Sequence, residues 1–184
     1  LPYRTDISVG DLIFALNVSG VFDENRQYAG NVLEWADVTK SRSDAGALAA
    51  LDRSQAIIEF SLDGKIITAN KNFLGAIGYS LDEIRGQHHA MFVEPALRNS
   101  PEYRAFWDKL ARGEYDAGQY KRLAKGGREI WIQASYNPIL DGNGRPFKVV
   151  KFASDITEQM NIAFRVQEIA DVVSAASTEM RATA

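Results

Sequence analysis

The sequence contains no cysteine among its 184 residues. This absence excludes disulfides, thiolate-bound metal ions, iron–sulfur clusters, a cysteine nucleophile and a cysteinyl flavin adduct. It also suits a reducing compartment, so we expect the protein to be cytoplasmic. Residues 1–4 show neither a starting methionine nor the pattern of a signal peptide, and we interpret the chain as part of a longer protein.

Long apolar runs and a strong charge of one sign are missing too. No stretch approaches 18 uncharged apolar residues, so no membrane span is expected. The 21 basic and 24 acidic residues leave a net charge of −3, which argues against nucleic-acid binding. The only histidines, His88 and His89, are adjacent, and the glycine pairs lie in turns. Neither a catalytic triad nor a phosphate-binding loop is indicated, so we expect no enzyme.

An internal repeat organises the chain. Three pairs share a constant offset of 118 residues: Asp23 and Asp141, Asp37 and Asp155, and Thr39 and Thr157. One residue of slack at the Gly126-Gly127 turn also aligns Tyr3 with Tyr120. The same period-two alternation occurs in both copies: Leu12, Phe14, Leu16 and Val18, then Ile130, Ile132, Ala134 and Tyr136. Each copy is therefore predicted to form three antiparallel strands.

The repeat divides the chain into four predicted parts. Residues 1–40 are interpreted as the last three strands of a preceding, truncated domain, and residues 41–54 as a linker helix. Residues 55–157 form one complete domain, because only the second copy has further elements in front of it. Residues 158–184 are interpreted as a signalling helix that leads to an output domain.

The elements between the copies have clear local signals. Asp63-Gly64 predicts a hairpin within residues 57–69, and Ser80 with Glu83 forms a capping box. Ser100-Pro101 predicts the start of a longer helix. Its apolar face contains Tyr103, Phe106, Trp107 and Leu110. The predicted fold class is α+β, with a five-stranded antiparallel sheet flanked by short helices.

The last segment has a coiled-coil pattern. Its apolar residues are spaced four and three apart: Ile162, Val166, Ile169, Val173, Ala176 and Met180. This heptad seam predicts an amphipathic helix that pairs with its twin in a homodimer, although a helix packed on its own domain has the same pattern. Trp131 is expected on the outer face of the sheet, where a partner helix or a second subunit would cover it.

The strand order and the terminal Asp155-Ile156-Thr157 resemble a PAS sensor domain. The resemblance covers residues 52–157 and, as a half copy, residues 1–39. Several segments are similar to the PAS domains of bacterial methyl-accepting, aerotaxis-like chemotaxis transducers: residues 68–73, 86–89, 106–110, 125–131 and 138–141. Residues 173–180 are similar to the approach to a transducer signalling domain. The resemblance implies a cytoplasmic dimer within a chemotaxis signalling complex.

The resemblance also implies a cofactor pocket, with FAD first and haem b or no cofactor as alternatives. Trp107 is similar in position to the tryptophan that aerotaxis transducers place against the flavin ring, and either His88 or His89 would be the haem ligand. Residues 93–96 depart from the Arg-His-Pro-Asp that flavin-binding relatives carry there. The candidate cofactor-binding side chains are Trp107, His89, Asn72, Met91, Ala134, Tyr136 and Arg122.

Two functional roles remain open at this point. In the first, the pocket detects redox state, oxygen or a small ligand, and Asp155 and Thr157 relay the change to the last helix. In the second, the domain is a cofactor-free module for dimerisation and relay. The isolated strands in residues 3–39 are expected to pair with another chain, for example by strand exchange in a homodimer.

Overall fold

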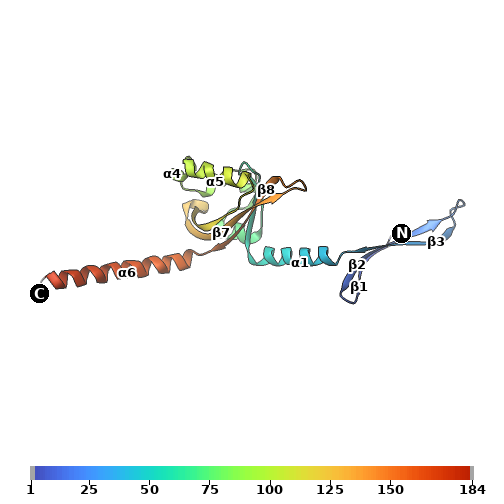
Figure 1. The fold of residues 1–184 in the computed structure, drawn as a ribbon, viewed down its shortest axis with the longest axis horizontal. Helices are drawn as coiled ribbons and strands as arrows, with labels where there is room; N and C mark the ends of the chain where they lie inside the picture. The colour runs from blue at the N-terminus through green and yellow to red at the C-terminus, as the bar shows by residue number, and fades with distance from the viewer. Residues whose placement is uncertain (1–2, 183–184) are drawn as a thin grey trace. The chain divides into compact units, whose positions relative to one another are not determined.

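The computed structural model describes residues 3–182, with side chains described to residue 177. The chain divides into two compact units, Leu1–Arg53 and Ser54–Ala184. The first unit contains β1 (Tyr3–Val9), β2 (Leu12–Phe22), β3 (Tyr28–Asp37) and α1 (Thr39–Ser54) (Figure 1). Its strands form an antiparallel sheet in the order β1-β2-β3.

The predicted alignment of Tyr3 with Tyr120 is wrong. Tyr3 pairs with Val18, whereas Tyr120 pairs with Ile132, whose equivalent in the first copy is Phe14. The two copies differ because residues 10–11 join the strands of the first copy, whereas residues 124–128 join those of the second. The register of the first strand of each copy therefore follows the length of this turn rather than the shared tyrosine.

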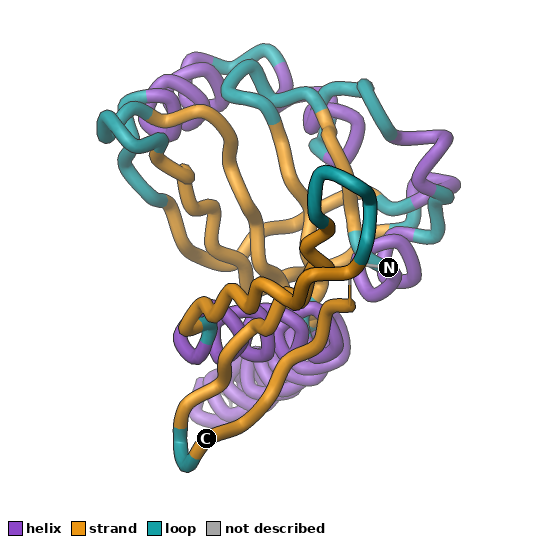
Figure 2. The backbone as a smooth tube through the Cα atoms, turned by 90° about the vertical axis from the view of Figure 1, so that its right-hand side faces the viewer, coloured by secondary structure: helices purple, strands orange, loops and turns teal. Residues whose placement is uncertain are grey.

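The second unit contains one five-stranded antiparallel sheet, as predicted. Its strands are β4 (Ala56–Phe60), β5 (Ile66–Ala69), β6 (Asp116–Leu123), β7 (Glu129–Leu140) and β8 (Pro146–Asp155). Its helices are α2 (Lys71–Ile77), α3 (Leu81–Ile84), η1 (His89–Phe92), α4 (Pro95–Arg98), α5 (Pro101–Ala111), η2 (Lys125–Gly127) and α6 (Thr157–Ala182). The strand order is β5-β4-β8-β7-β6, so β8 lies at the centre. Figure 2 shows the sheet and helices of this unit.

Local signals explain where these elements begin. Gly64 turns the β4–β5 hairpin with φ of +80°, and a Cβ there would lie 2.5 Å from His88 Nε2, so only glycine fits. The Glu83 carboxylate accepts the Ser80 amide at 2.8 Å, which confirms the capping box. The Ser100 hydroxyl accepts the amide of Tyr103 at 3.1 Å and caps α5.

The core lies between the sheet and the short helices. Strand β7 turns alternate residues inward, and Ile130, Ile132, Ala134 and Tyr136 are all buried, as their period-two pattern predicted. Helix α5 buries Tyr103, Trp107 and Leu110 against this layer, and Phe106 is partly buried there. The side chains of β7 and α5 thus belong to one apolar core in the second unit.

Helix α6 continues directly from the end of β8. Phe164 covers the outward-facing Trp131, with the ring centroids 5.8 Å apart, so the chain's own helix provides part of the cover that this tryptophan needs. The predicted seam residues Ile162, Val166 and Ile169 remain exposed. The side chain of Met180 lies outside the described residues. Among the described residues, no helix is long and apolar enough to span a bilayer.

Candidate functional site

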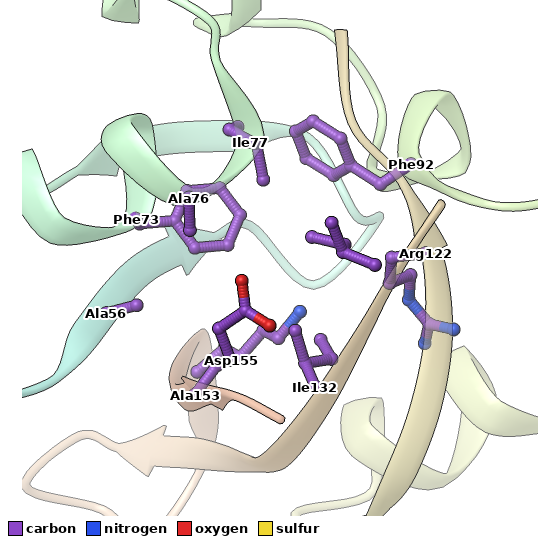
Figure 3. A pocket seen from close by; sticks show the side chains of 11 residues that line it. Ala56, Phe73, Ala76, Ile77, Phe92, Arg122, Ile132, Ala153 and Asp155 are labelled. Carbon is purple, nitrogen blue, oxygen red and sulfur yellow. The ribbon is translucent and has the colours of Figure 1, made fainter. Parts of the chain in front are cut away.

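A small cavity lies in the core of the second unit. Its volume is about 20 Å³, which is room for roughly one water molecule. The lining residues are Ala56, Phe73, Ala76, Ile77, Phe92, Arg122, Ile130, Ile132, Lys151, Ala153 and Asp155. Figure 3 shows Phe73, Ile77 and Phe92 along one side, with the Asp155 carboxylate directed towards the interior from the end of β8. The wall is therefore apolar apart from three charged side chains.

His89 lies at the centre of the buried polar groups. It is fully buried, its Nδ1 is 2.8 Å from the Tyr103 hydroxyl, and its Nε2 is 3.0 Å from the Tyr136 hydroxyl. A neutral imidazole has one donor and one acceptor nitrogen and so satisfies both phenols. Burial is the main cause that holds the pKa of His89 well below 6.5, and the nearby charges of Lys151 and Arg122 act in the same direction. Burial likewise raises the pKa of Tyr103, to about 12.

The two histidines have different roles. His88 accepts the amide of Ala90 through Nδ1 at 3.0 Å and caps the short helix η1. His89, by contrast, is fully buried and is directed into the core. An iron ligand needs a free nitrogen lone pair. Both ring nitrogens of His89 are hydrogen-bonded to tyrosine hydroxyls, so His89 could bind iron only by losing one of these bonds.

Arg122 is buried rather than solvated at a hairpin tip. Only 6% of its surface is exposed, although it begins near the charged β6–β7 turn. Its Nη2 donates to the Tyr136 hydroxyl at 3.2 Å, and its guanidinium lies 4.8 Å from the Tyr120 ring centroid. Its Nε is buried without an acceptor in the described part of the chain. Figure 3 shows the stem of Arg122 against the cavity and the guanidinium directed outward.

Lys151 is the most deeply buried of the charged side chains that line the cavity. It lies on the central strand β8, faces Ile58 on one side and Tyr136 on the other, and is 1% exposed. Its Nζ lies 4.9 Å from the Tyr136 ring centroid and 5.5 Å from that of Phe73. Among the described residues it has no hydrogen-bond acceptor and no ion-pair partner. Burial, and secondarily the charge of Arg122, holds the pKa of Lys151 well below 10.5.

The cavity does not fit a flavin or a haem as the side chains lie. Pockets for ligands of drug size measure about 300–1,000 Å³, whereas this cavity measures about 20 Å³. Trp107, the predicted flavin partner, is packed edge-to-face against Phe60, His89 and Phe106, with centroids 5.5–5.6 Å away. Its ring is therefore packed into the core and presents no free face to a flavin.

The other predicted cofactor-binding residues are not brought together. Asn72 is exposed, and its Nδ2 donates to the Gln55 carbonyl at 3.1 Å on the outside of α2. Met91 and Ala134 pack in the core without lining the cavity. Within the described residues, no group of three or more histidine or acidic side chains is placed to hold a metal ion. Of the predicted set, only Arg122 lines the cavity, and Tyr136 and His89 form the layer beside it.

A second feature, the strand–helix junction, connects the cavity wall to α6. The Asp155 carboxylate accepts the amide of Thr157 at 2.8 Å and its hydroxyl at 2.5 Å. Thr157 Oγ1 in turn accepts the amide of Trp131 on β7 at 3.0 Å, and the Ile156 amide donates to the Trp131 carbonyl at 2.8 Å. Asp155 therefore belongs to both features, because it lines the cavity and holds the first residue of α6.

The first unit repeats this junction in detail. The Asp37 carboxylate accepts the Thr39 amide and hydroxyl at 2.9 and 2.6 Å, and Thr39 Oγ1 accepts the Ile13 amide at 2.8 Å. The hairpin turns match as well: Asp23 accepts the amides of residues 25 and 27, and Asp141 those of residues 143 and 145. The offset of 118 residues therefore reflects two copies of one structural unit.

Sequence reasoning did not find Lys151. The signal was present, because β8 alternates and Lys151 lies in phase with Val149 and Ala153, both buried. Lysine is rarely buried, so its residue type alone gives no reason to place it in the core. The position of Lys151 in phase with two apolar residues on the same strand predicts that its side chain faces inward.

Comparisons with known proteins identify the same family by a family model and by related sequences. A family model described as the PAS fold matches residues 66–153. The chain is 46% identical over 140 residues to the biofilm dispersion protein BdlA of Pseudomonas aeruginosa, a match that covers 74% of this chain and 33% of BdlA. It is 32% identical over 79 residues to the aerotaxis receptor of Escherichia coli, covering 43% of this chain and 15% of the receptor.

A solved structure agrees with this match. The PAS domain of a protein from Colwellia psychrerythraea superposes with a TM-score of 0.55 and 24% identity, covering 63% of this chain and 98% of that domain. This likeness concerns the fold. The chain thus spans 33% of the length of BdlA and 15% of the length of the aerotaxis receptor.

Proposed function

Since the chain contains a PAS domain, as predicted, we propose that its second unit is a non-catalytic sensor module of a chemotaxis-type transducer. In this proposal the core cavity detects a small ligand, and its state is relayed through Asp155, Ile156 and Thr157 to α6. The relatives' names, a biofilm dispersion protein and an aerotaxis receptor, support a signalling role. Flavin or haem sensing is less well supported, since neither group fits the cavity.

One observation carries this proposal: Asp155 lines the cavity and also binds Thr157. A charge or group that enters the cavity acts on the Asp155 carboxylate through space. Asp155 cannot move without changing its two bonds to Thr157, the residue at which α6 begins. The Thr157→Ala variant tests the proposal, because it removes the hydroxyl of this junction while every residue that lines the cavity is kept. We expect it to retain ligand binding and to lose the response of α6.

We further propose that the chain acts as a homodimer. In the first unit, Leu33 and Trp35 are exposed, although their equivalents in the second unit, Lys151 and Ala153, are buried. An apolar sheet face of this kind needs cover, and strand exchange by residues 3–39 of a second copy would provide it. The exposed seam of α6 gives a second contact along the same dimer.

The molar mass in solution checks the homodimer. Light scattering is expected to give twice the chain mass of 20.4 kDa. Trp35→Glu should reduce it to the monomer mass if the sheet face holds the dimer together. Ile169→Asp should do so if the helix seam holds it. A wild-type mass of one chain at every concentration would contradict the proposal.

A further inference from the structure

Lys151 presents an electrostatic problem that the described protein does not solve by itself. A buried ammonium is expensive unless a carboxylate or several acceptors neutralise it. Lys151 is 1% exposed and, in the part of the chain that the structure describes, meets only the faces of two aromatic rings. Cation–π contacts of this kind offset part of the cost of burial, but they leave the charge without a counter-ion.

The surroundings add positive rather than negative charge. Arg122, 6% exposed, lines the same cavity and carries an Nε–H without an acceptor among the described residues. Asp155 is the single carboxylate among the lining residues, and the bonds to Thr157 already engage it. The next carboxylate on β8's neighbour β4, Glu59, pairs with Lys148. The cavity lining therefore contains two buried basic side chains and one carboxylate, that of the exposed Asp155, which Thr157 already engages.

From this arrangement we propose that the cavity is a binding site for a small carboxylate, whose oxygen atoms accept from Lys151 Nζ. This inference rests on the proposed function, for which it names the ligand class. The apolar lining by Phe73, Ile77 and Phe92 suits the hydrocarbon end of such a molecule, and the positive charge of Arg122 favours its anionic end. The volume of about 20 Å³ holds roughly one water molecule, so lining side chains must move aside even for formate and acetate, the smallest acids, which need the smallest movement.

The ligand also suits the relay. A carboxylate beside Lys151 places a negative charge in the cavity that Asp155 lines, and it repels the Asp155 carboxylate, with solvent screening part of this repulsion because Asp155 is exposed. A bound carboxylate therefore pushes the Asp155 carboxylate away from the cavity. This displacement changes the two hydrogen bonds that Asp155 accepts from Thr157. Occupancy and the position of the first turn of α6 are coupled in this way without any large change in fold.

Sodium formate and sodium acetate are the probes, titrated into the full chain at constant ionic strength and followed by amide NMR. We expect saturable shifts at Lys151, Ala153 and Phe73 in the wild type. Lys151→Met should weaken binding about 10- to 100-fold, the value of a hydrogen bond to a charged group. Lys148→Met is the matched control, because it removes a lysine from the same strand outside the cavity, and it should bind like the wild type.

Three results would overturn the inference. The first is the absence of saturable shifts in the wild type, and the second is equal binding by the two methionine variants. The third is an equal response to chloride, which would assign the site to any small anion. If Lys151→Met does not fold, the wild-type shifts decide alone. Formate binding without any change at the Trp131 amide would retain the carboxylate site and contradict the relay instead.

Discussion

Replacing Thr157 by alanine is expected to release α6 from the sheet while the cavity remains intact. The change removes the acceptor of the Trp131 amide and one of the two bonds to Asp155. Loss of a helix-terminal hydroxyl contact costs about 1 kcal/mol, and a partly buried amide left without an acceptor costs about 1 kcal/mol more. Together they correspond to a change of about 30-fold in local opening. Hydrogen exchange at the first turn of α6 and at the Trp131 amide measures it.

The first unit provides a matched control for this variant. Thr39 makes the same bonds to Asp37 and to the Ile13 amide. Thr39→Ala should therefore speed exchange at Ile13 and the start of α1 by a similar factor and leave Trp131 unchanged. Equal protection of Trp131 in the wild type and in Thr157→Ala would show that the hydroxyl does not hold the junction together.

Replacing His89 by phenylalanine is expected to cause the largest loss of stability. The variant leaves the Tyr103 hydroxyl without its partner and removes one partner of the Tyr136 hydroxyl, both in the core. A buried donor or acceptor without a partner costs about 1–3 kcal/mol, so the two together should cost about 2–4 kcal/mol. Urea denaturation at pH 7.5 measures this loss, and we expect an unchanged denaturant slope if the fold is retained.

The pH dependence identifies the histidine specifically. The pKa of His89 in the folded protein lies well below 6.5, so below pH 6.5 the unfolded chain binds a proton that the folded protein does not. The stability that the neutral His89 contributes is therefore present above pH 6.5 and falls as the pH falls below it. The lowered pKa of Lys151 acts with the same sign, so the difference between the wild type and His89→Phe isolates the histidine.

His88→Asn is the control for this second experiment. Asparagine retains an acceptor for the amide of Ala90 at the start of η1, where His88 now provides one. This variant should keep the acid dependence of the wild type, whereas His89→Phe should lose the part due to His89. The same acid dependence in His89→Phe and in the wild type would contradict a neutral, buried His89.

Much of the fold could be predicted from the sequence because its signals are local or periodic. The offset of 118 residues predicted two copies of a three-stranded unit, and each copy ends in an Asp-x-Thr with the same hydrogen bonds. The capping box at Ser80 and the start of α5 at Pro101 follow from short-range chemistry. The shifted tyrosine alignment shows the limit, because turn length sets the register and a shared residue does not.

The site was harder to predict because its properties depend on the surroundings of each side chain. Trp107 and His89 were predicted to bind a cofactor. The sequence could not show that the Trp107 ring packs against three aromatic neighbours, or that both His89 nitrogens already bond to phenols. Arg122 was predicted to bind a cofactor, but the sequence could not show that its side chain is only 6% exposed and bonded to the Tyr136 hydroxyl. Lys151 passed unnoticed because lysine usually lies at the surface, and burial rather than residue type gives it its role.

The exchange rate of the Trp131 amide, measured with and without saturating formate, tests the central claim most directly. This amide donates to Thr157 Oγ1, while its strand neighbours Ile130 and Ile132 line the cavity. The comparison with Thr157→Ala therefore separates an effect through the junction from an effect along β7. The account predicts a change of about tenfold or more on binding in the wild type, and no change in Thr157→Ala, which still binds formate. An exchange rate that stays the same while formate occupies the cavity would contradict the account.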